Sequence, residues 1–177
     1  MAIKTFTTGE VLTAADTNTY LANSGLVYVA GGALSGTSTT FTNCFSTTYD
    51  AYRVIIQAGG TTGNTLKLKW NGSTGSTYNT NGYYTIVGFS ALNSEFESNN
   101  SGGIYLGYLS NSTSYFQADI RGPYLAQVTG VSAQFSGDQY QGTYSGIDKN
   151  TSSSTNLSVT AAVSLSGNIS IYGYRKA

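Results

Sequence analysis

The sequence has no histidine and only one cysteine among its 177 residues. A Ser-His-Asp triad, a cysteine-histidine pair, a histidine-ligated metal and a histidine pH switch all need an imidazole. The single Cys44 cannot form an internal disulfide or a paired-cysteine metal site, and no base is present to activate it. We therefore expect no catalytic residue, no metal ligand and no cofactor, and we predict that the protein is not an enzyme. Cys44 is predicted to be a small buried apolar residue.

Charged side chains are also scarce. They make up 9% of the chain, and 8 basic residues balance 8 acidic ones to a formal net charge of zero. Scattered charges with this sum provide no basic surface for a nucleic-acid backbone or an anionic membrane. The chain has no apolar run long enough to cross a bilayer, and its first residues lack the apolar segment of a signal peptide. We expect synthesis in a cytoplasm, without nucleic-acid binding or membrane insertion.

Hydrophobic residues make up 40% of the chain and aromatic residues 13%, which is enough for one core. From residue 26 onward, apolar and polar side chains alternate with a period of two, the pattern of half-buried strands. The clearest cases are residues 66–70 and 157–165. The Gly-containing segment 166–168 predicts a hairpin that joins the second of these strands to residues 169–174.

The whole pattern comprises about ten short strands, separated by Gly and Asn, with no second helical block. It predicts an all-β fold over residues 26–177, an antiparallel β-sandwich or jelly roll. We place the following side chains on its inner face: Val54, Ile56, Leu66, Leu68, Trp70, Ile86, Phe116, Ala118, Ile120, Val159, Val163, Ile169 and Ile171.

The N-terminal segment contains the one predicted α-helix. Thr13 and Asp16 resemble a capping box, and residues 14–23 run from there to Gly25, a suitable C-terminal stop. An isolated helix of about ten residues is marginal in water, so this helix needs a surface to dock on.

Three groups of polar residues are candidate sites. Glu95 and Glu97 are spaced to share a strand face as a carboxylate pair, but the Asn and Ser residues around them favour an exposed polar loop. Asp119 and Arg121 share a strand face, which predicts an ion pair. The segment 148–150 is rich in oxygen ligands, as a bound cation requires, although tight-turn chemistry explains the same residues.

The tyrosines are the most informative side chains for binding. The alternation directs Tyr105, Tyr115, Tyr172 and Tyr174 outward, while Tyr78, Tyr83 and Tyr84 lie in or beside a Gly- and Asn-rich loop. Tyrosine combines a rigid apolar ring with a hydroxyl, which suits subunit contacts and carbohydrate faces alike. We name Tyr78, Tyr83 and Tyr84 as candidate ligand contacts.

Two parts of the sequence resemble proteins of tailed-bacteriophage virions. Residues 4–21, with Gly9-Glu10 and the run Leu12-Thr13-Ala14-Ala15-Asp16, resemble the opening of many minor tail and fibre-like proteins. The rest resembles a phage β-sandwich module in the segments 49–56, 66–68, 83–84 and 166–174.

The resemblance implies that residues 1–25 form an attachment segment and that the β-domain projects outward. The segment would pack against other virion proteins or a neighbouring subunit through Val11, Leu12, Ala15, Tyr20 and Leu21. Fibre proteins are usually trimeric, so a homo-oligomer, preferably a trimer, is expected in the virion, with a host surface glycan as a further partner. The chain lacks long shaft repeats, which favours a short tail or baseplate appendage.

Three alternatives stay open from the sequence. A capsid decoration protein of jelly-roll type would use the same domain and the same neutral surface. A stand-alone carbohydrate-binding module would not need the attachment segment. A glycan-degrading enzyme would have to use Glu95 and Glu97 as its carboxylate pair.

Overall fold

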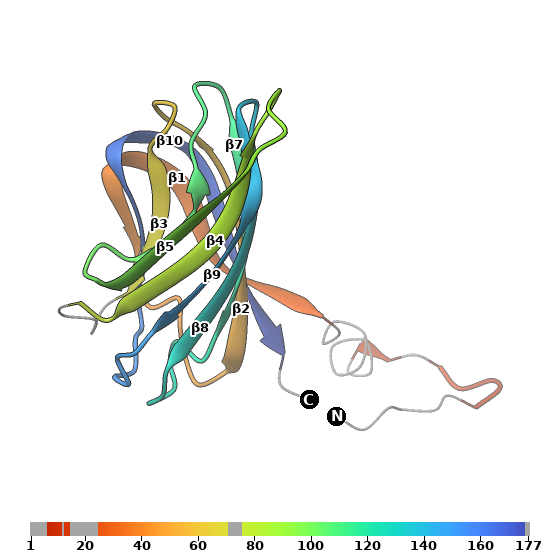
Figure 1. Cartoon of the computed structure of the whole chain (residues 1–177). Helices are drawn as coiled ribbons and strands as arrows, with labels where there is room; N and C mark the ends of the chain where they lie inside the picture. Colours follow the sequence, from red (N-terminus) through yellow and green to blue (C-terminus); the bar gives the residue numbers. More distant parts are fainter. Residues whose placement is uncertain (1–6, 12, 15–24, 71–75, 176–177) are drawn as a thin grey trace.

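The computed structural model of the chain describes residues 7–11, 13–14, 25–70 and 76–175. Its fold is all-β and antiparallel, which confirms the predicted class (Figure 1). The strands are β1 (Leu26–Phe41), β2 (Tyr49–Gly59), β3 (Thr65–Trp70), β4 (Tyr78–Ile86), β5 (Leu92–Asn100), β6 (Ile104–Tyr108), β7 (Ser114–Arg121), β8 (Thr129–Ser136), β9 (Tyr140–Asp148) and β10 (Leu157–Arg175). Nothing in these ranges forms a helix of the length and apolarity that a membrane span requires.

The ten strands form one hydrogen-bonded sheet that curls over itself. Its order is β5-β4-β9-β8-β7-β2-β10-β3-β6, with β1 paired to β10 beside this path. The sheet has two parts, a larger one that runs from β5 to β2 and a shorter one made of β3 and β6. Strand β10 joins them, because residues 166–175 pair with β2 and residues 157–160 pair with β3. Strand β6 packs against β8 and β9, so the short β3–β6 part covers the inner face of the larger part (Figure 1).

The hairpin predicted at residues 166–168 is wrong, because β10 runs without interruption from Leu157 to Arg175. The ladder to β2 continues through the expected turn, with Gly167 opposite Ala58 and Asn168 opposite Gln57. Gly167 has a φ of +122°, and a Cβ built there would lie 2.0 Å from the Gln57 carbonyl oxygen. The glycine therefore permits a close approach of two strands instead of a reversal of the chain.

The polar loop predicted around Glu95 and Glu97 is also wrong, because these residues lie in β5, a strand at one end of the sheet. Inward-pointing charges are one device by which an edge strand avoids pairing with another chain. Here both glutamates are half-buried, while Leu92 and Phe96 are 67% and 69% exposed. The alternation in β5 is inverted, with charged side chains facing inward and apolar ones facing outward, so its sequence resembles that of a loop.

The predicted core is largely confirmed. All thirteen proposed inner-face side chains are buried except Ile86 and Val163, which are half-buried. Cys44 is buried as expected, and its burial raises the pKa of the thiol to about 11. Tyr105, which was expected to face outward, is only 5% exposed. Strand β6 is covered on both faces, and its pairing with β3 contains a register shift, so simple alternation fails there.

The oxygen-rich segment 148–150 begins at the last residue of β9, and its carboxylate is buried. Asp148 is 1% exposed, and its Oδ2 accepts a hydrogen bond of 2.7 Å from Trp70 Nε1. Its Oδ1 accepts one of 3.0 Å from the Asn150 backbone N–H, which confirms the predicted turn chemistry. No group of three or more potential metal-binding Cys, Asp or Glu side chains occurs in the part of the chain that the structure describes.

The predicted helix over residues 14–23 lies outside the described residues, apart from Ala14. The same holds for Leu12, Ala15, Tyr20 and Leu21 of the attachment segment. Val11 is described and is 78% exposed. It follows a turn in which the Glu10 N–H donates to the Thr7 carbonyl oxygen at 3.0 Å. Residues 7–11, 13 and 14 are all exposed, so none of these described residues packs on the sheet.

Candidate binding face

The outer face of the larger part of the sheet carries two rows of mostly polar side chains, which we call the glutamine face. Cross-strand pairing from β2 through β7, β8 and β9 to β4 aligns them directly. The first row is Ile55, Gln117, Gln134, Thr143 and Tyr83, and the second is Gln57, Tyr115, Ser136, Gln141 and Thr85. Five strands thus supply one continuous surface.

Three adjoining hollows follow the glutamine face, with volumes of about 520, 190 and 390 Å³. Gln134 lines all three and so lies at their centre. Tyr115 lines the hollow at one end and is 56% exposed, whereas Tyr83 lines the hollow at the other end and is 51% exposed. Their strands are three strand spacings apart, or roughly 14 Å.

The amide groups on this face are available to a ligand. Gln57, Gln117, Gln134 and Gln141 are exposed, and none of their side chains makes a hydrogen bond with another residue that the structure describes. Each amide offers two N–H donors and one carbonyl acceptor. The face therefore presents donors and acceptors side by side.

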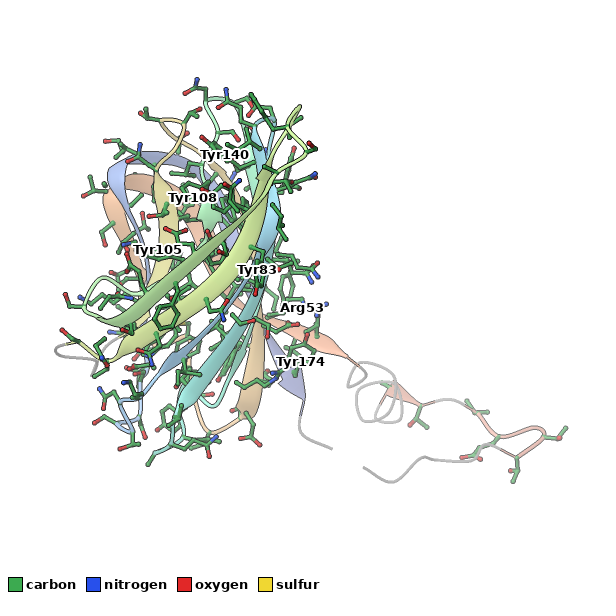
Figure 2. All side chains as sticks on the ribbon, viewed as in Figure 1. Arg53, Tyr83, Tyr105, Tyr108, Tyr140 and Tyr174 are labelled. Carbon is green, nitrogen blue, oxygen red and sulfur yellow. The ribbon has the colours of Figure 1, made fainter. Side chains whose placement is uncertain are left out.

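Charge reaches the glutamine face only at its margin, where Asp119 lines the smallest hollow. Arg53 Nε and Nη2 each donate to an oxygen of Asp119 at 2.8 Å, and the Tyr174 hydroxyl also donates at 2.8 Å (Figure 2). The predicted Asp119–Arg121 pair is therefore wrong in its partner, because the ion pair is made across strands to Arg53. The hydrogen bond from Arg53 lowers the pKa of Asp119.

The Asp119 pair gives a pH-dependent prediction. Because its folded-state pKa is lowered, the carboxylate contributes stability above the ordinary Asp pKa of about 4, and this is lost as the pH falls through the lowered value. Asp119→Asn should therefore reduce stability by about 1 kcal/mol at neutral pH. It should also flatten the loss of stability below about pH 4. Urea unfolding at several pH values measures both, and identical acid slopes for the two proteins would contradict the assignment.

A second cluster lies on the inner side, where side chains connect the two ends of the sheet. Strand β6 supplies Tyr105, whose hydroxyl donates to Glu97 of β5, and Tyr108, whose hydroxyl donates to Glu95 at 3.0 Å (Figure 2). Tyr144 of β9 donates to the same Glu95 oxygen at 2.6 Å. We call these five residues the tyrosine seam. Both glutamates accept hydrogen bonds from phenols, which gives them a structural role in joining the edges.

Aromatic packing supports the tyrosine seam. The ring of Tyr108 stacks on Tyr140, with centroids 5.1 Å apart, and Tyr84 lies 4.7 Å from Tyr108. Lys67 Nζ lies 4.2 Å from the centroid of the Tyr105 ring. Burial, followed by the nearby carboxylates, raises the pKa of Tyr105, Tyr108 and Tyr144 well above the usual range. The phenols therefore remain protonated donors.

The tyrosine seam predicts loss of stability in alkali. The raised pKa values mean that these phenols contribute stability below about pH 10, which is lost as the pH rises toward their folded-state values. Glu95→Gln removes the charge that disfavours the phenolates of Tyr108 and Tyr144, so it should make stability above pH 10 less dependent on pH. Denaturant unfolding combined with tyrosinate absorbance measures this. An unchanged slope in the variant would contradict the role given to Glu95.

The three candidate ligand tyrosines do not form one site. Tyr78 is fully buried, and its hydroxyl accepts a hydrogen bond of 3.3 Å from the Trp70 backbone N–H. Tyr84 is half-buried against Tyr108, so only Tyr83 lies on the outer surface. The reason is the strand period of two, which places residues 78 and 84 on one face of β4 and residue 83 on the other.

The glutamine face was not identified from the sequence, although its polar positions were visible there. Gln134 lies on the exposed face of β8, but the pairing that aligns it with Gln117 and Thr143 depends on strand order. No protein-family model, curated protein or solved structure significantly matches the chain.

Proposed function

We propose that this chain is a structural protein of a tailed-bacteriophage virion, a short tail or baseplate appendage that docks through residues 1–25. The observation that carries the proposal is the N-terminal segment. Its sequence resembles the opening of phage tail proteins, and its apolar Val11 is 78% exposed. An apolar residue that the described sheet leaves uncovered, beside Leu12 in the sequence, is suited to burial against a partner.

The surface of the domain supports the same role. A formal net charge of zero and 9% charged residues leave hydroxyls and amides to solvate the sheet. The partners in this proposal are other virion proteins and further copies of the chain, with a trimer preferred. We include in the proposal that the curled sheet is a strongly bent β-sandwich whose two layers stay joined through β10.

The docking role is tested with charge in the apolar part of the segment. The double variant Val11→Asp, Leu12→Asp should reduce incorporation into purified particles about tenfold or more, because two buried carboxylates would be unpaired. Thr8→Asp adds a charge at an exposed turn position nearby and should leave incorporation unchanged. Equal incorporation of all three proteins would contradict docking through this segment. Thermal unfolding checks that the sheet is intact in each.

Copy number distinguishes the appendage from a capsid decoration protein. Decoration takes hundreds of subunits per head, and an appendage takes far fewer. Quantifying the protein against the major capsid protein in purified virions decides between them. A decoration-like ratio would overturn the tail assignment and keep the virion assignment.

A further inference from the structure

We propose that the glutamine face binds an uncharged oligosaccharide, with Gln134 at the centre of the site. The inference rests on the proposed function in one respect, since an outward-facing virion protein would bring this surface to the glycans of a host. The site itself is argued from the chemistry of the face.

The combination of groups on the face matches the chemistry of a sugar. A sugar ring presents neighbouring hydroxyls, each a donor and an acceptor, and an amide answers both through its N–H groups and its carbonyl. The exposed amides of Gln57, Gln117, Gln134 and Gln141 make no hydrogen bond within the described part of the chain. Hydroxyls of Thr143 and Ser136 lie beside them in the same rows.

The exposed rings of Tyr115 and Tyr83, on β7 and β4, lie on either side of the strands that carry Gln134 and Gln141. Aromatic rings provide rigid apolar area at low entropic cost, on which the C–H face of a sugar packs. Tyr115 and Tyr83 are separated by about three strand spacings, roughly 14 Å, with Gln134 between them. This arrangement fits an extended chain of several sugar units laid across the strands.

The ligand is inferred to be uncharged because the face has no free charge to pair with one. The two rows contain no Lys, Arg, Asp or Glu. Asp119 at the margin is already held by two hydrogen bonds from Arg53. An anionic polysaccharide would lose hydration here without gaining a cation, whereas a neutral one exchanges water for amides.

A second copy of the chain fits this face less well. The centre of a protein–protein interface is apolar and is sealed by large side chains such as Trp, Met and Arg. The centre of the glutamine face is instead occupied by Gln117, Gln134 and Thr143, all exposed. Burying these amides against protein would require a partner for each one. A flexible polyhydroxylated ligand meets that requirement more readily.

The test follows the side-chain amide resonances of the full-length protein by ¹⁵N NMR. The probes are neutral oligosaccharides of glucose, galactose, mannose and N-acetylglucosamine, added singly. At least one is expected to shift the amide signals of Gln117 and Gln134, equally at low and high salt, since no charge pairing is involved. No shift with any probe would overturn the proposal. Shifts that appear with protein concentration alone would also overturn it, and would assign the face to self-association.

Substitutions then locate the site. Gln134→Ala and Tyr115→Ala should each weaken binding of the active probe about tenfold or more, with unchanged thermal unfolding. The matched controls are Gln127→Ala and Tyr28→Ala, which remove an exposed glutamine and an exposed tyrosine that line none of the three hollows. Equal losses in the controls and the site variants would overturn the assignment to this face.

Failure of this inference is separable from failure of the proposed function. Gln134→Ala should enter particles normally while losing the sugar, because the docking segment is untouched. A wild-type protein that enters particles and shifts no amide signal would refute the site alone. A protein that binds the sugar and is absent from virions would refute the proposed function and leave the site in place.

Discussion

Gly107→Ala is expected to destabilise the folded protein by about 2–5 kcal/mol. A Cβ built at this position would lie 2.3 Å from the ring of Phe135, because β6 crosses over β8 there. Gly107 also has a φ of +147°, a backbone angle that residues other than glycine rarely adopt. The close approach of β6 to β8 in the curled sheet therefore depends on the absence of a side chain at position 107. Urea unfolding of wild type and variant gives the difference in free energy.

Gly130→Ala is the matched control. Gly130 lies in β8, the strand that also carries Phe135, but a Cβ there would meet no atom within 4 Å. Alanine should therefore be neutral or slightly stabilising, because it reduces the entropy of the unfolded chain. If both variants lost stability equally, the close approach of β6 to β8 would not be the cause.

Trp70→Phe is expected to cost about 2–4 kcal/mol. The change removes the Nε1–H that donates to the buried carboxylate of Asp148 at 2.7 Å. Phenylalanine also leaves part of the indole volume empty, at a position that is 3% exposed. Denaturant unfolding again measures the loss.

A double-mutant cycle separates the hydrogen bond from the packing. Asp148→Val alone leaves the indole N–H buried without its acceptor, but Trp70→Phe combined with Asp148→Val removes both partners. The double variant should lose less than the sum of the single losses, by about 1 kcal/mol or more. Additive losses would show that Trp70 acts through its volume alone.

The sequence predicted the strands best where alternation was regular and one face was fully covered. Leu66, Leu68 and Trp70 are buried as expected, since each lies on the side of β3 that faces the core. Strand β5 was missed because its inward side chains are Glu95 and Glu97, whose burial depends on phenols from β6 and β9. A charged residue satisfied by a distant strand has no local signature.

The other wrong predictions also arose from contacts between strands that are distant in the sequence. Gly167 suggested a turn, but a glycine is needed there because the Gln57 carbonyl of β2 leaves no room for a side chain. Asp119 was assigned to Arg121 on its own strand, whereas pairing of β2 with β7 places Arg53 directly opposite. The glutamine face was invisible for the same reason, since five strands must be ordered before its rows exist. Residue type and the period of two predict which face of a strand a side chain lies on. Only the order of the strands in the sheet determines which side chains are its neighbours on the next strand.

The position of β10 has a consequence for how the protein folds. It follows the other nine described strands in the sequence, yet it lies between β2 and β3 in the order of the sheet and also pairs with β1 along most of its length. During synthesis, the earlier strands therefore wait with open edges until residues 157–175 leave the ribosome. Such long-range pairing slows folding and exposes edges to other chains.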